Sequence, residues 1–167
     1  FLGDSAVGKT SIIQKIKINE FKNEHTSTTG YGCTQYVMNE GGTIIKFQLW
    51  DTAGQEKYRS LSPNVYKNAD AIVIVFDITQ QKSLDVAAFW LEQVNKSCVN
   101  NPVILLLGNK CDIDKNVDDK SIQQFVQQQK IFYFDSSAKT GQGLDEAMQC
   151  IAKNAQIDVK PLMLQQK

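Results

Sequence analysis

The sequence lacks an excess of either charge, a long apolar run and any CxxC pair of cysteines. Eighteen lysines and arginines balance eighteen aspartates and glutamates, so the net charge predicts neither a nucleic-acid partner nor a membrane surface held by charge alone. No apolar run approaches the roughly 18 residues that a membrane-spanning helix needs. The four cysteines, Cys33, Cys98, Cys111 and Cys150, lie far apart, which favours reduced thiols in the cytosol over a disulfide framework.

The chain has the length and composition of one soluble domain. Its 167 residues can bury a sizeable core, and 42% hydrophobic and 22% charged residues are ordinary for a globular protein. We find no internal repeat, linker or signal peptide, and expect one domain over residues 1–158. The opening Phe1-Leu2-Gly3 resembles the cut end of a buried strand, so we expect the true start of the chain to be missing.

Apolar runs alternate along the chain with segments of helical periodicity. Nearly continuous apolar runs at 71–77 and 102–109 are typical of strands buried on both faces of a parallel sheet. Shorter strands are expected at 44–50, with Ile45, Phe47 and Leu49 on one face, and at 131–135. Helices are expected at 11–19, 84–95, 121–129 and 145–156. This order predicts an α/β fold with three layers, an open and mostly parallel sheet with helices on both faces.

The segment GDSAVGKT fits the phosphate-loop pattern GxxxxGK[ST] between the first strand and the first helix. Its glycines let backbone N–H groups point at phosphate oxygens, and the helix that follows adds its positive end. Lys9 can reach the β- and γ-phosphates, and the hydroxyl of Thr10 can ligate Mg²⁺. The motif alone does not distinguish ATP from GTP, or a kinase from a switch. The nucleotide-binding residues expected here are Gly3, Asp4, Ser5, Ala6, Val7, Gly8, Lys9, Thr10 and Ser11.

The segments NKCD (109–112) and SSAK (136–139) follow two successive apolar strands. The carboxylate of Asp112 can accept hydrogen bonds from both N1–H and the 2-amino group of guanine, a donor pair that adenine lacks. Asn109 can brace the loop, the stem of Lys110 can cover a ring face, and the Ala138 N–H can reach the guanine oxygen. Either tetrapeptide alone is also compatible with a plain loop; together, after a phosphate loop, they indicate guanine. The residues expected around the base are Asn109, Lys110, Asp112, Ser137, Ala138 and Lys139.

The segment DTAGQE (51–56) ends another predicted strand. Asp51 is placed to hold Mg²⁺ through water, in the manner of a Walker-B aspartate. Gly54 leaves room for its N–H to approach a γ-phosphate, and Gln55 can orient the attacking water. The chemistry expected is hydrolysis of a γ-phosphate by positioning and charge stabilisation.

With these four motifs the whole chain resembles a small GTPase of the Ras superfamily. The segments KFQLW, KYRSLS and IVFDIT resemble the Rab branch. The resemblance implies a P-loop G domain with a six-stranded sheet over residues 1–158 and a variable tail that begins at 159–167. It also implies a GDP/GTP switch with Mg²⁺ that hydrolyses GTP slowly without an activating protein and regulates vesicle traffic.

The resemblance also implies a switch I threonine that closes on Mg²⁺ and the γ-phosphate, which falls on Thr28. Phe21 matches an aromatic near the guanine. Three residues depart from the Rab pattern here: Thr29, Gly32 and Cys33 replace an isoleucine, an acidic residue and a phenylalanine. That phenylalanine belongs to a surface aromatic triad, whose other two positions are expected at Trp50 and Tyr66. We therefore expect weakened binding of the usual effectors.

The partners implied are an exchange factor, a GTPase-activating protein and effectors, acting through switch I and through switch II from Gly54 to about Ser62. A monomer on the cytosolic face of endomembranes, Golgi or vesicles, is expected, with a membrane anchor only if a missing tail is prenylated. The alternative is a pseudo-GTPase scaffold that holds nucleotide but no longer cycles. An ATP-dependent kinase fits poorly, because the chain lacks a lid segment and Asp112 favours guanine.

Overall fold

The computed structural model describes residues 1–19, 31–52 and 66–155. These ranges contain six strands and four helices. The strands are β1 (Leu2–Gly3), β2 (Tyr31–Glu40), β3 (Thr43–Thr52), β4 (Ala71–Asp77), β5 (Val103–Asn109) and β6 (Phe132–Asp135). The helices are α1 (Lys9–Ile18), α3 (Gln81–Ser97), α4 (Asp119–Gln129) and α5 (Leu144–Asn154).

The strands in these ranges form a four-stranded parallel sheet and a two-stranded antiparallel hairpin. The parallel sheet has the order β1-β4-β5-β6, and β2 pairs with β3 along its whole length. Phe1 links the two groups, since its main-chain nitrogen donates to the Trp50 carbonyl at 2.8 Å and its carbonyl accepts from Thr52 Oγ1 at 2.6 Å. The expected open, mostly parallel α/β arrangement is therefore confirmed, whereas the six strands of these ranges pair as four and two and not as one continuous six-stranded sheet.

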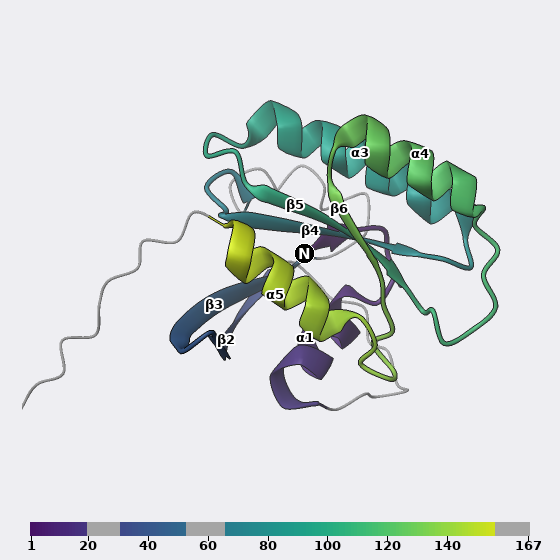
Figure 1. Ribbon diagram of the computed structural model, residues 1–167. Coiled ribbons are helices and arrows are strands. Elements are labelled where there is room, and N and C mark those ends of the chain that lie inside the picture. The colour runs from purple at the N-terminus through teal and green to yellow at the C-terminus, as the bar shows by residue number, and fades with distance from the viewer. Residues whose placement is uncertain (20–30, 53–65, 156–167) are drawn as a thin grey trace, which may run out of the picture.

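Helices cover both faces of the parallel sheet, which confirms the predicted three layers. Figure 1 shows α3 and α4 on one side and α1 and α5 on the other. Alternate residues of β4 point to opposite faces of the sheet. Ile72 and Ile74 pack in the cluster that contains α3, and Val73 and Val75 pack in the cluster that contains α1 and α5. Both faces of the strand are buried, which is why its sequence is continuously apolar.

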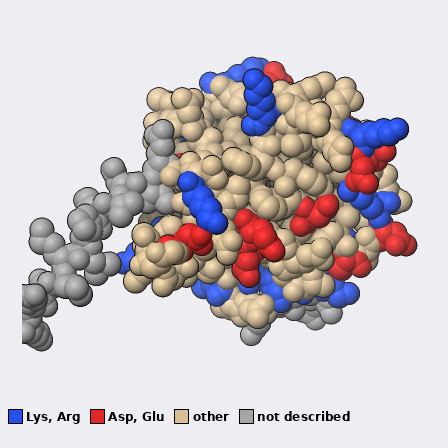
Figure 2. Space-filling view, viewed as in Figure 1, with Lys and Arg blue, Asp and Glu red and all other residues tan. Residues whose placement is uncertain are grey.

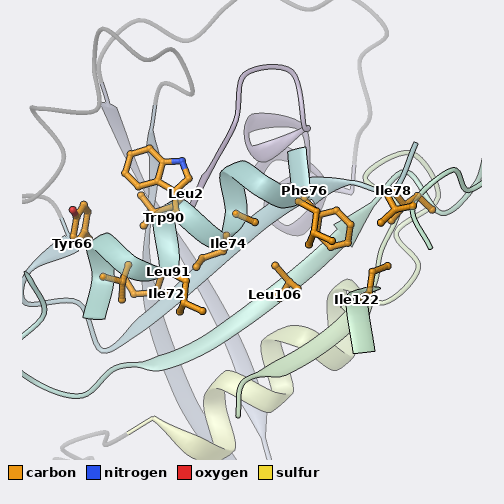
Figure 3. Packing of buried hydrophobic residues seen from close by; sticks show 14 residues of the cluster. Leu2, Tyr66, Ile72, Ile74, Phe76, Ile78, Trp90, Leu91, Leu106 and Ile122 are labelled. Carbon is orange, nitrogen blue, oxygen red and sulfur yellow. The ribbon is translucent and has the colours of Figure 1, made fainter. Parts of the chain in front are cut away.

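The larger core cluster includes Trp90, a large and fully buried residue of α3. Figure 3 shows the Trp90 ring beside Leu2 and Leu91 beside Ile72, and all of these residues belong to one core cluster. The exposed fraction of Trp90 is 1%, and its ring meets the ring of Tyr66 edge-on at 6.4 Å. Burial of side chains of this size contributes about 2–3 kcal/mol each, so this layer fixes α3 on the sheet.

The four parallel strands end at one edge, and the loops that follow them carry the motifs. Gly3, Asp77, Asn109 and Asp135 are the last residues of β1, β4, β5 and β6. Ligands of open parallel sheets bind at this edge. On the face seen in Figure 2, acidic and basic side chains are interspersed, as the balanced composition predicts. Within the described part of the chain, no helix is both long and apolar enough to span a bilayer.

Candidate nucleotide-binding site

The phosphate loop runs from the end of β1 into the first turn of α1, and two of its positions accept only glycine. A Cβ on Gly3 would lie 2.2 Å from the Val75 carbonyl oxygen. Gly8 caps the N-terminus of α1 with φ +101°, and a Cβ there would lie 2.2 Å from Asn109 Nδ2. The glycines thus allow the loop to pass close to the ends of β4 and β5.

The remaining loop residues differ in exposure. Val7 is buried, whereas Ser5 and Ala6 are exposed, and Ala6 has a left-handed backbone with φ +57°. Asp4 accepts a hydrogen bond from the Ser5 backbone N–H at 2.8 Å through Oδ1. Ser11, in the first turn of α1, is buried. These residues form the expected strand–loop–helix unit.

The side chain of Lys9 folds back over the loop that precedes it. Its ammonium donates to the carbonyl oxygens of Gly3, at 3.1 Å, and Asp4, at 2.6 Å, and the residue is only 5% exposed. Burial lowers the pKa of Lys9 to about 8, although the nearby charges of Asp51 and Asp4 raise it. A cation held at this point can exchange a carbonyl for a phosphate oxygen.

Two oxygen-bearing side chains meet where α1 begins and β3 ends. The Thr10 hydroxyl donates to Asp51 Oδ2 at 2.7 Å. Hydroxyl and carboxylate oxygens are ligands that Mg²⁺ accepts, so these residues fit the metal that the fold implies. Among residues 1–19, 31–52 and 66–155, no group of three His, Cys, Asp or Glu side chains gathers into a metal site. Water, phosphate oxygens and the predicted Thr28 hydroxyl could complete the oxygen ligands that Mg²⁺ prefers.

Asn109 ties the phosphate loop to the SSAK loop. Its side chain is 1% exposed; Nδ2 donates to the Val7 carbonyl at 2.8 Å, and Oδ1 accepts from the Ala138 N–H at 3.0 Å. The predicted bracing by Asn109 is therefore present. In this arrangement the Ala138 N–H points at Asn109, and its contact with guanine stays a prediction.

Asp112 of the NKCD loop contacts the SSAK loop through its carboxylate. Its Oδ1 accepts a hydrogen bond of 2.5 Å from Ser137 Oγ, and Lys139 Nζ lies 4.0 Å from Oδ2. Ser137 is fully buried, and its Oγ also accepts from the Thr140 N–H at 3.1 Å. These contacts hold the carboxylate at the loop edge, where it could accept hydrogen bonds from a base.

The sequence analysis did not single out Asp77, whose carboxylate contacts a residue of the NKCD loop. The Lys110 ammonium lies 2.5 Å from Asp77 Oδ2, and Asp77 is only 1% exposed. Burial alone raises the pKa of Asp77, but hydrogen bonds from Lys110 and Thr79 outweigh it and lower the pKa below its ordinary value. A carboxylate that ends a wholly apolar strand was the available signal, since such a charge needs a buried partner.

Four predicted site residues, Phe21, Thr28, Gly54 and Gln55, lie outside the described residues, as do the positions of the tail at 159–167. Their roles stay predictions.

The expected surface position of Tyr66 is wrong. Tyr66 is 4% exposed and belongs to the core cluster, where it packs on Trp90. The aromatic that approaches Trp50 is instead Tyr31, with ring centroids 5.9 Å apart. Tyr31 lies two residues before Cys33, which pairs with Trp50 across the hairpin, so both side chains stand on the same face of β2.

A cavity of about 640 Å³ lies between β3 and β4, and Thr52 is the one described residue of the four motifs that lines it. Its walls mix apolar residues such as Phe47, Leu49 and Met148 with polar ones such as Gln48 and Asp70. None of its lining residues belongs to GDSAVGKT, NKCD or SSAK, so we assign no part of the nucleotide site to it.

Comparison with known proteins agrees with this geometry. A family described as "Ras family" matches residues 1–157. The chain is 36% identical to the GTP-binding protein ypt5 of Schizosaccharomyces pombe, over 95% of this chain and 77% of that protein. It is 35% identical to the GTP-binding protein YPT53 of Saccharomyces cerevisiae, over 91% and 73%, and 34% identical to the Ras-related protein Rab-13 of Bos taurus, over 92% and 76%. The chain belongs to the Ras family, as a Rab-like small GTPase.

Proposed function

We propose that this Rab-like small GTPase binds GDP and GTP with Mg²⁺ at the edge of the sheet where the phosphate loop, the NKCD loop and the SSAK loop meet. The observation that carries the proposal is the side chain of Asn109, which bonds the Val7 carbonyl and the Ala138 N–H at once. A single nucleotide needs its phosphate site and its purine site held at a fixed separation. A single rigid amide that joins both loops supports one ligand over two separate sites.

Each group of residues has a distinct task in this proposal. Backbone N–H groups of the loop Gly3–Gly8 hold the pyrophosphate, and Lys9 pairs with the β- and γ-phosphates. Thr10 and Asp51 hold Mg²⁺, directly or through water, with Thr28 as a third oxygen; when bound, the metal neutralises phosphate charge. Asp112 selects guanine, and Phe21 and Lys110 flank the ring. Gly54 and Gln55 position the γ-phosphate and the attacking water.

The regulation proposed is that of a switch with external partners. The only arginine, Arg59, lies in the predicted switch II, and no other arginine can act as a finger in cis. An activating protein that supplies this charge is worth roughly 10³–10⁵ in rate. Effectors and an exchange factor would contact switch I and switch II. The cytosolic face of endomembranes is the proposed location, through a prenylated tail, and vesicle traffic is the process served.

The first experiment identifies the bound nucleotide. The purified protein is denatured, and the released nucleotide is separated by chromatography and compared with guanine and adenine standards. We expect GDP or GTP in near-equal amount to protein. Adenine nucleotides, or a protein that retains no nucleotide after reloading with GTP, would contradict the proposal.

The second experiment separates a cycling switch from a non-cycling scaffold. The protein is loaded with GTP, and phosphate release is followed for wild type, Gln55→Leu and the control Gln48→Leu, an exposed position of β3. We expect slow release by wild type and by the control, and release slower by about tenfold or more in Gln55→Leu, because the water is no longer oriented. Retained GTP with no phosphate released by wild type would favour the scaffold.

A further inference from the structure

The buried carboxylate at the end of β4 is held from several sides. Asp77 Oδ1 accepts from the Thr79 N–H at 2.9 Å and from Thr79 Oγ1 at 2.7 Å, and its Oδ2 pairs with Lys110 Nζ at 2.5 Å. Its own backbone N–H donates to Ser83 Oγ at 2.9 Å, at the start of α3. With both oxygens and the backbone fixed, Asp77 is a rigid anchor point.

The turn that follows Asp77 also holds the two ends of the NKCD loop through the backbone. The Ile78 N–H donates to the Asn109 carbonyl at 3.1 Å. The Ile78 carbonyl accepts from the N–H groups of Asn116, at 3.0 Å, and Val117, at 2.9 Å. The segment between Asn109 and Val117, which contains Lys110 and Asp112, is therefore clamped to the end of β4 at both ends.

Inside that segment, Lys110 has a backbone conformation that side-chain-bearing residues rarely adopt. Its φ is +72°, in the left-handed region. Such a conformation persists when the surroundings restrain it. The Lys110 carbonyl accepts from the Ile113 N–H at 3.1 Å, and the side chain is restrained by its ion pair with Asp77. Asp112 lies two residues further on in the same segment, so we expect a change at Lys110 to alter the placement of the Asp112 carboxylate.

We propose that Asp77 is a positioning residue for guanine recognition, which fixes Lys110 and thereby the orientation of the Asn109–Lys110–Asp112 edge; this inference rests on the proposed function. The Lys110 ammonium cannot leave Asp77 without leaving a buried charge uncompensated. The base loop is therefore already ordered before nucleotide arrives, and binding need not supply the cost of ordering it.

The test compares GDP with inosine diphosphate, which lacks the 2-amino group of guanine. Dissociation rates of both nucleotides are measured for wild type and Asp77→Asn, with Asp85→Asn, the same change at an exposed position of α3, as control. We expect Asp77→Asn to speed GDP dissociation by about tenfold and to bring the GDP and inosine diphosphate rates closer together. A merely structural loss would speed both nucleotides equally and leave their ratio unchanged.

A second pair of variants tests whether Asp77 acts through Lys110. Lys110→Met removes the ammonium and keeps the aliphatic stem, and it remains informative if Asp77→Asn does not fold. We expect Lys110→Met to reduce the same ratio, and the double variant Asp77→Asn/Lys110→Met to dissociate GDP no faster than the faster single variant.

Three results would overturn the inference: a wild-type GDP rate in Asp77→Asn, an unchanged ratio between the two nucleotides, or effects that multiply in the double variant. Failure of the proposed function has a different signature. Wild type would then not retain GDP, or Asp112→Asn would leave the preference for guanine intact; either result removes the inference together with its premise.

Discussion

The Thr10 hydroxyl and Asp51 Oδ2 lie 2.7 Å apart, although 41 positions separate them in the chain. The contact brings the first turn of α1 against the end of β3. The chain between them includes Thr28, the predicted switch I threonine. A metal bound at this contact would therefore touch both ends of the segment that is expected to respond to the γ-phosphate.

Replacement of Thr10 tests this relationship. Thr10→Asn is expected to weaken Mg²⁺-dependent retention of GTP by at least about tenfold, because a hydroxyl ligand is lost, and to favour empty or GDP-bound protein. Thr10→Ser keeps the hydroxyl and serves as the matched control. Retention is measured as GTP dissociation with and without excess EDTA. Equal sensitivity to EDTA in wild type and Thr10→Asn would remove Thr10 as a metal ligand.

The base specificity of Asp112 is tested by exchanging its acceptor oxygen for a donor. In Asp112→Asn the amide can donate to the C2 oxygen of xanthine, whereas one donor of guanine loses its acceptor. GTP affinity is expected to fall by roughly 100-fold and affinity for xanthosine triphosphate to rise. Competition against a fluorescent guanine nucleotide measures both. The control is Asp114→Asn, two residues along the chain. An unchanged preference would show that another group selects the base.

The lowered pKa of Lys9 predicts a pH dependence of nucleotide binding. In the free protein burial holds this pKa near 8, and phosphates would raise it, so binding above pH 8 must take up a proton. Affinity for GDP is then expected to fall as pH rises above about 8, by up to about tenfold per unit. Calorimetry at pH 8.5 in two buffers of different ionisation enthalpy measures the proton uptake. Lys9→Arg should show none, and uptake that survives in Lys9→Arg would assign it to another group.

The close approach of Gly8 to Asn109 predicts a coupled loss of stability and binding. A methyl group on Gly8 would meet Asn109 Nδ2, and the left-handed backbone adds strain of about 1–3 kcal/mol. Gly8→Ala is therefore expected to lower the melting temperature and to speed nucleotide dissociation. Gly32→Ala is the control, since nothing lies within 4 Å of a Cβ there. Similar melting temperatures for the two variants would argue against the clash.

The buried strands and the helices were the easiest elements to predict. The apolar runs of β4 and β5 have no alternation because both faces are covered, and their predicted bounds agree with the structure to within one residue. The start of α1 was placed two residues late, since Gly8 caps the helix through its backbone and has no capping side chain. The predicted face of Ile45, Phe47 and Leu49 is confirmed as the more buried face of β3.

The elements that sequence reasoning missed depend on contacts between distant residues. β2 was not predicted, because its pattern YGCTQYVMNE mixes polar and apolar residues and its partner β3 supplies the hydrogen bonds. Tyr66 was expected on the surface from a family pattern, but the space beside Trp90 buries it. The motif loops were placed correctly at the strand ends, whereas Asp77 became recognisable only through its contact with Lys110.

Asn109 has a consequence for how this protein would release its ligand. One amide side chain makes hydrogen bonds with both the Val7 carbonyl and the Ala138 N–H. Displacement of either loop would therefore disturb the position of the other. An exchange factor would not need to displace the phosphate-binding loop and the purine-binding loops separately. Displacement of the loop at one end of the site would weaken the contacts with both the phosphates and the purine of the nucleotide.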